Sequence, residues 1–196
     1  WDSSLYPGLD KVIEHYRTKG VRFLGYINPY LAVEGNLFRE AADTGYLVKN
    51  KAGEDYITDM GAFMAGHVDL TNPQAFQWYK KVIINNLIGL GLSGWMADFG
   101  EYLPADAVLF NGICAEKMHN QWPVLWMQLN REAVEEAGKL GEVVFFNRSG
   151  YSGCQKHALL LWGGDQNVDW SPDDGLPSVI PAALSSGISG MGLFHS

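Results

Sequence analysis

The chain has 196 residues, a formal net charge of −8 and 47% hydrophobic residues, which suits one domain with a buried core. No apolar run approaches the about 18 residues that a membrane span requires, so we expect no membrane insertion. The 14 basic residues are scattered along the chain, which argues against nucleic acid as a partner. The first residues (WDSSLYPGLD) show no secretion signal, so we expect a cytoplasmic protein whose natural N-terminus lies outside this chain.

Short apolar runs alternate with amphipathic segments. Five runs are predicted to be strands: residues 21–28, 94–99, 143–147, 158–162 and 188–194. Helices are predicted between them: residues 9–19, a helix that starts at Pro73 with Asn72 as its cap, residues 122–137 and residues 179–184. This alternation is typical of an α/β protein with a parallel sheet.

Two α/β architectures fit this pattern, a doubly wound open sheet and a (β/α)8 TIM barrel. The glycine fingerprint GxGxxG of dinucleotide-binding sheets is absent, which disfavours a nicotinamide- or phosphate-binding protein. Polar residues follow the predicted strands, as they do at the face of a barrel where active sites form: Asn28, Asp98, Asn147-Arg148, Asp165 and His195. Five strands cannot close a barrel of eight. We therefore expect residues 1–196 to be an incomplete part of a (β/α)8 barrel domain.

One chemistry that such a site can perform divides its work between two carboxyl groups with different roles, and Asp98 is the first candidate. It follows an apolar strand directly, in the segment WMADFGE. An aspartate at this place can simply cap the next helix, but Phe99-Gly100 offers no helix start, so a functional carboxylate is favoured. Glu101 could itself be catalytic, although we favour a role as the partner of an arginine.

Asp165 is the second candidate, in the segment WGGDQNVDW. The two glycines before it allow a sharp turn and the close approach of a ligand. Partial burial beside the strand would keep its carboxyl protonated, as a general acid requires. The alternative is a solvated acidic loop, and Asp169 is the main rival for the role.

Three further residues are candidates for substrate contact. Arg148 is either a surface charge or the donor of forked hydrogen bonds to a carboxylate or a sugar. His195 is either a donor to substrate hydroxyls or a structural histidine, and Trp162 is either a pocket wall, which we favour, or core. The other histidines lack metal-ligand spacing and Cys114 and Cys154 form no CxxC pair, so we expect free thiols, no metal and no cofactor.

At these residues the chain resembles glycoside hydrolase family 31, over essentially its whole length. The resemblance implies that residues 1–196 are the central part, about strands 3 to 7, of the catalytic (β/α)8 barrel domain of that family. The nucleophilic aspartate of the family corresponds to Asp98 and its Arg-Ser pair to Arg148-Ser149. Its acid/base, which follows Trp-x-Gly, corresponds to Asp165, and its substrate-binding histidine to His195. The resemblance implies a retaining hydrolase of a small-molecule α-glycoside, with Asp98 as nucleophile and Asp165 as general acid/base. Around the substrate we expect four residues: Arg148, His195, Trp162 and Glu101.

Within the family, ADFGEYLP and GDQNVDWSPDDG are most similar to members that hydrolyse α-sulfoquinovosides and release sulfoquinovose. The residues that contact the sulfonate in such members are expected outside this chain. One alternative is an α-glucosidase or α-xylosidase of the same family acting on neutral sugars, and another is a sugar-binding barrel without catalysis. The sequence leaves open whether the longer protein is a homo-oligomer.

Overall fold

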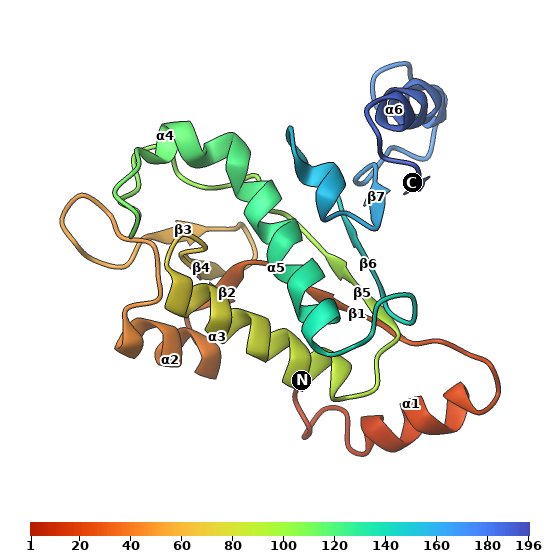
Figure 1. Cartoon of the computed structure of the whole chain (residues 1–196), viewed down its shortest axis with the longest axis horizontal. Helices are drawn as coiled ribbons and strands as arrows, with labels where there is room; N and C mark the ends of the chain where they lie inside the picture. The colour runs from red at the N-terminus through yellow and green to blue at the C-terminus, as the bar shows by residue number, and fades with distance from the viewer.

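The main sheet is parallel and its strands lie side by side in chain order. The computed structural model describes residues 1–196, and the sheet has the order β1-β5-β6-β7-β8 (Figure 1). Its strands are β1 (Leu24–Ile27), β5 (Gly94–Ala97), β6 (Val144–Asn147), β7 (Leu160–Trp162) and β8 (Phe194–His195). A doubly wound sheet reverses its strand order at a switch point. This sheet adds each strand on the same side, as a barrel does.

The helices around the sheet are α1 (Leu9–Arg17), α3 (Pro73–Ile83) with its π-helical extension Ile84–Ile88, α4 (Ala115–Met118), α5 (Trp122–Glu136) and α6 (Leu176–Ile188), with single 3-10 turns at His119–Gln121 and Cys154–Lys156. Of these, α3 and α5 cover one face of the sheet, and their buried residues share one core with those of β5 and β6. Figure 1 shows α3 and α5 side by side across the sheet. The predicted start of α3 is confirmed, because Asn72 accepts a hydrogen bond from the Gln74 N–H at 2.9 Å and Pro73 occupies the first helical position.

The alternation of side chains along the strands separates the core from the opposite face of the sheet. Trp95 and Phe145 are fully buried on the helix side, where their rings stack 6.2 Å apart. The Trp95 indole donates to Asn130 Oδ1 on α5 at 2.8 Å, so its polar atom is satisfied within the core. Residues of the opposite parity, such as Met96 and Tyr26, therefore face what would be the interior of a barrel.

A second sheet, which the sequence analysis did not predict, follows β1. It is antiparallel, with the order β2-β4-β3, and consists of β2 (Tyr30–Ala32), β3 (Ile57–Asp59) and β4 (Met64–His67). The helix α2 (Asn36–Thr44) lies beside it (Figure 1). Because β2 begins three residues after β1 ends, this sheet lies beyond the carboxyl end of the parallel sheet.

The fifth predicted strand is present as β8, but it does not have the predicted bounds of residues 188–194. Helix α6 continues to Ile188, Gly190 turns the chain with a φ of 91°, and β8 has only two residues, Phe194–His195. Of the predicted segment only Phe194 lies in the strand, because residues 189–193 form the turn and the connection after the helix. None of the helices combines the length and the apolar character that crossing a bilayer requires.

Candidate active site

A row of side chains runs across the carboxyl ends of the parallel strands. The register pairs Tyr26 with Met96, Met96 with Phe146, and Trp162 with His195. Continued by two residues, it aligns the following side chains on one face of the sheet: Asn28, Asp98, Arg148, Trp162 and His195. Four of the five strand-end positions that the sequence analysis named thus share one level, and Asp165 is the exception.

Asp98 is the one carboxylate of this row, and it is buried, at 6% exposure. Its Oδ1 accepts from the Phe99 N–H at 2.9 Å and lies 3.4 Å from Arg148 Nε, and its Oδ2 accepts from the Tyr26 hydroxyl at 2.7 Å. The buried indole of Trp126 donates to the carbonyl of Asp98 at 3.1 Å. Both the backbone and the carboxylate are therefore fixed in position, which a reacting group requires.

Phe99, directly after Asp98, has a left-handed backbone. Its φ of 57° is the one positive value outside glycine, and a bulky residue reaches that conformation only when its surroundings compensate. Here Ser149 Oγ donates to the Phe99 carbonyl at 2.7 Å, and the Arg148 guanidinium lies 4.1 Å from the centre of the Phe99 ring. This turn directs the Phe99 N–H onto the Asp98 carboxylate. As expected, no helix starts there for Asp98 to cap.

Arg148 pairs with Glu101, which confirms the predicted arginine partner. Its Nε and Nη2 donate to Glu101 Oε1 at 2.8 and 2.6 Å. Burial opposes the positive charge, but the hydrogen bond to Glu101 and the negative charges of Glu101 and Asp98 outweigh it and raise the pKa of Arg148. The three side chains together carry a charge of −1 when both carboxylates are ionised. Such a site favours positive charge developing on a bound molecule.

Beyond β7 the structure differs from the expectation for Asp165. The strand ends at Trp162, and Asp165 lies three residues further on, in an exposed loop rather than partly buried. The positive φ of Gly164, 83°, turns the chain away from the strand. Asp165 lines a hollow of about 700 Å³ together with Trp162 and Gln166. Trp162 therefore forms a pocket wall, while the catalytic role of Asp165 stays a prediction.

His195 and Trp162 form an aromatic pair at the end of the row. Their rings are stacked with centres 6.5 Å apart, and Phe146 packs edge-on against His195 at 4.8 Å. The imidazole is exposed in this chain. Its predicted contact with substrate hydroxyls remains a prediction.

Asp169, the rival of Asp165, serves the local turn. Its Oδ1 accepts from the N–H of Ser171 at 2.9 Å and from its hydroxyl at 2.7 Å. These bonds lower the pKa of Asp169 and keep it ionised, which is unsuitable for a proton donor.

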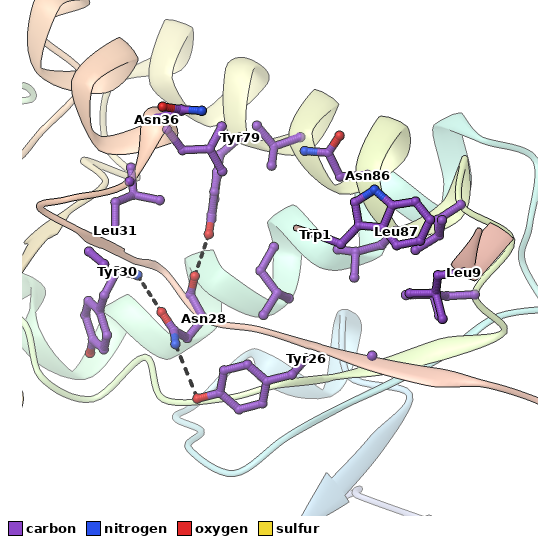
Figure 2. A pocket seen from close by; sticks show the side chains of 18 of the residues that line it. Trp1, Leu9, Tyr26, Asn28, Tyr30, Leu31, Asn36, Tyr79, Asn86 and Leu87 are labelled. Carbon is purple, nitrogen blue, oxygen red and sulfur yellow. Dashed lines mark hydrogen bonds between the residues drawn. The ribbon is translucent and has the colours of Figure 1, made fainter. Parts of the chain in front are cut away.

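A second hollow, of about 680 Å³, lies at the free edge of β1. Its lining is mostly apolar, with Leu9, Ile27 and Leu87 among its residues, and it includes neither Asp98 nor Arg148 (Figure 2). It lacks the carboxylates that glycoside chemistry needs. No three side chains of the kinds that bind metal ions are gathered anywhere in the chain.

Sequence reasoning missed Tyr26 and Trp126, which both bind Asp98. The alternation of side chains along a strand could have indicated Tyr26, because a residue two positions before Asn28 points to the same face of the sheet. Trp126 reaches Asp98 from a helix, and no local pattern indicates such a contact.

A parallel sheet in barrel order, with a buried carboxylate, an arginine and aromatic rings along its carboxyl edge, is the arrangement found at the active-site face of a TIM-barrel enzyme. Comparison with known proteins gives the family. Residues 1–196 match the model of the glycosyl hydrolases family 31 TIM-barrel domain, and the chain belongs to this family.

Its relatives include sulfoquinovosidases. It is 57% identical to the sulfoquinovosidase of Escherichia coli (strain K12) and 50% identical to that of Agrobacterium fabrum, over its whole length in both cases. It spans 29% and 30% of the length of these curated relatives. A family 31 sulfoquinovosidase from E. rectale, solved with an aza-sugar inhibitor, superimposes with a TM-score of 0.98 at 51% identity, covering 100% of this chain and 30% of that one.

Proposed function

We propose that the protein containing this chain is a retaining α-glycosidase that hydrolyses α-sulfoquinovosides. The observation that carries the proposal is Asp98, a buried carboxylate with fixed orientation at the end of β5, in a site with a net negative charge. Such a carboxylate can attack an anomeric carbon and stabilise the positive charge of an oxocarbenium-like transition state. Residues 1–196 form part of the catalytic barrel domain.

The reaction takes two steps. Asp98 attacks the anomeric carbon while Asp165 gives its proton to the departing glycosidic oxygen, and a β-glycosyl-enzyme forms. Water then attacks the same carbon and gives a proton to Asp165, the bond to Asp98 breaks, and the α-sugar leaves. Two features support Asp165 in this role: β7 is next but one to β5, and Asp169 is committed to its own turn.

The other four residues predicted to contact the substrate lie in the row of strand-end side chains or beside it. Arg148 and Glu101 are joined beside Asp98, and Trp162 and His195 lie on the side of Asp165. We propose that all four surround the sugar. The engagement of Glu101 by the guanidinium supports a role in orienting Arg148 rather than a second nucleophile.

The sulfonated substrate is supported by the relatives. The chain is 57% and 50% identical to two sulfoquinovosidases, but 31% identical to the α-xylosidase XylQ of Lactiplantibacillus pentosus over 76% of its length. The test compares kcat/KM of the full-length protein on 4-nitrophenyl α-sulfoquinovoside and 4-nitrophenyl α-glucoside. A preference for the glucoside would contradict the substrate and favour the neutral-sugar alternative.

The mechanism has its own tests. Proton NMR of the first-formed sugar should show the α-anomer, and a β-anomer would refute retention. Asp98→Asn keeps the shape of the side chain and should lower kcat at least about 1,000-fold, because it removes the attacking charge. Asp169→Asn is the matched control, and it should retain activity within a few-fold. If Asp98→Asn stays near the wild-type rate, the proposed function is wrong.

A further inference from the structure

A chain of hydrogen bonds leads from the second sheet to the Asp98 carboxylate. The Tyr30 N–H donates to Asn28 Oδ1 at 3.0 Å (Figure 2). A backbone N–H can only donate, so this contact fixes which end of the Asn28 amide is oxygen. The amide nitrogen then faces the Tyr26 hydroxyl at 3.2 Å and donates to it. The proton of that hydroxyl is left for Asp98 Oδ2, at 2.7 Å.

Residues from three separate secondary-structure elements hold the donors of this chain of hydrogen bonds in place. Tyr26 belongs to β1 and Tyr30 to β2, and the fully buried Tyr79 of α3 donates to the Asn28 carbonyl at 2.5 Å (Figure 2). Asn28 cannot turn its amide without losing the bond from Tyr30. The direction of the Tyr26 proton is therefore built into the fold.

Tyr26 keeps this proton at any pH at which a glycosidase operates. Burial raises the pKa of Tyr26 to about 12, an effect that the hydrogen bond from Asn28 opposes and the bond to Asp98 increases. Two charged groups lie beside Asp98: Arg148, which follows β6, and Glu101, which follows β5 as Asp98 does. The Asp98 carboxylate forms its polar contacts with Tyr26, Phe99 and Arg148, and forms none with Asp165 or His195.

We propose that Tyr26 is a positioning residue for the glycosidase reaction, whose hydroxyl donates to Asp98 Oδ2, orients the carboxylate and stabilises its ionised form. This inference rests on the proposed role of Asp98 as nucleophile. An ester oxygen accepts a hydrogen bond more weakly than a carboxylate oxygen does. The bond from Tyr26 therefore strengthens as water attacks the glycosyl-enzyme, the C1–O bond breaks and its electron pair returns to Asp98. Tyr26 assists this second step more than the first.

The experiment uses the full-length enzyme and Tyr26→Phe. Without the hydroxyl, ionised Asp98 loses a donor, so the acidic limb of the kcat/KM profile should move to higher pH by about one unit. On the 4-nitrophenyl glycoside, kcat should fall about tenfold and KM should fall with it, because the glycosyl-enzyme accumulates. A burst of 4-nitrophenol should appear before the steady state.

Tyr56→Phe is the matched control, because Tyr56 also donates to an aspartate, Asp106 Oδ1 at 2.8 Å, and neither residue contacts Asp98. It should leave the acidic limb in place. An equal shift of the limb in Tyr56→Phe would overturn the proposal, and so would a folded Tyr26→Phe enzyme with an unchanged limb and no burst.

If Tyr26→Phe does not fold, 3-fluorotyrosine at position 26 provides the second variant. Its more acidic hydroxyl is a stronger donor, so the limb should move to lower pH; no movement, or movement to higher pH, would refute the inference. Asp98→Asn, assayed in parallel, separates the two proposals. If the Asp98→Asn enzyme is active, the glycosidase mechanism is refuted. If Asp98→Asn is inactive and Tyr26→Phe behaves like the wild type, only the role of Tyr26 is refuted.

Discussion

Replacing Glu101 by glutamine tests how the charge of Arg148 is balanced. Both guanidinium hydrogen bonds go to Glu101 Oε1, while Oε2 is buried without a partner. Glutamine can keep its oxygen at the Oε1 position and place its amide nitrogen at the other. Glu101→Gln therefore removes the negative charge with little change in shape. Arg148 loses its ion pair with residue 101 but still donates two hydrogen bonds to the oxygen of that side chain.

The magnitude follows from the type of bond that is lost. Hydrogen bonds to charged groups contribute about 1.5–3 kcal/mol, and neutral ones about 0.5–1.5 kcal/mol. The side chains of Arg148 and Glu101 are 20% and 30% exposed and share one acceptor oxygen, so solvent reduces the difference. We expect the variant to lose about 1–2 kcal/mol at this pair.

The same change affects activity. With residue 101 neutral, Asp98 is left as the one anion beside Arg148, with its Oδ1 3.4 Å from Nε, and the charge of the three side chains rises from −1 to 0. A more fully paired carboxylate is a weaker nucleophile and supports less positive charge at the anomeric carbon. A barrier about 1.4 kcal/mol higher corresponds to a tenfold fall in kcat/KM.

The assay combines thermal unfolding with kcat/KM of the full-length enzyme. Glu142→Gln is the control, because it makes the same substitution at the exposed pair with Lys139, at 2.7 Å, where the expected effect is small. If Glu101→Gln keeps kcat/KM within twofold while it melts normally, Glu101 does not set the charge that Asp98 experiences.

Two further predictions concern the surroundings of Asp98, and a third concerns the buried His67 of β4. Gly100→Ala should lower the melting temperature and the activity, because Gly100 has a φ of 106° and a Cβ would lie 3.1 Å from Ser149 Oγ. The free energy of unfolding in denaturant should fall by about 1–2 kcal/mol, and an unchanged unfolding midpoint would contradict the prediction. Trp126→Phe should lower the free energy of unfolding by about 1–3 kcal/mol, because the buried Asp98 carbonyl loses the indole N–H that donates to it. Trp1→Phe makes the same substitution at an exposed position and serves as the control. Burial lowers the pKa of His67 from 6.5 to about 4, so the unfolded state binds the proton at a higher pH than the folded state does. The free energy of unfolding should therefore fall as the pH drops from about 6.5 to about 4, by at most about 3 kcal/mol. The stability of His67→Phe should be less sensitive to pH over that interval, and equal sensitivity would refute the assignment.

Much of the parallel sheet was predictable from local patterns. The strands at residues 94–99 and 143–147 were recognised because they are apolar at almost every position, as strands covered on both faces are, and β5 and β6 lie within them. Asn72-Pro73 marked the start of α3 because both residues satisfy backbone requirements specific to a helix N-terminus. The pairing of Glu101 with an arginine followed from charge and position alone.

Other features depend on contacts between distant segments. Tyr26 reaches Asp98 only through the register of β1 against β5, which the residues of β1 do not encode by themselves. Asp165 was expected beside its strand, but β7 ends at Trp162 and the two glycines extend the loop into solvent. The second sheet escaped detection because its strands have only three or four residues, too few to show a period.

The row across the strand ends has a consequence for how substrate preference can change. Each of its positions is supplied by a different strand, and the ladder of backbone hydrogen bonds sets the spacing whatever side chain is attached. Exchanging Trp162 or His195 therefore alters one wall of the binding site and leaves Asp98, two or more strands away, where it was. Inserting a single residue into β6, by contrast, would turn Arg148 to the opposite face and leave Glu101 without its cation. New specificities are thus accessible through single substitutions at strand ends, while the lengths of the strands are constrained.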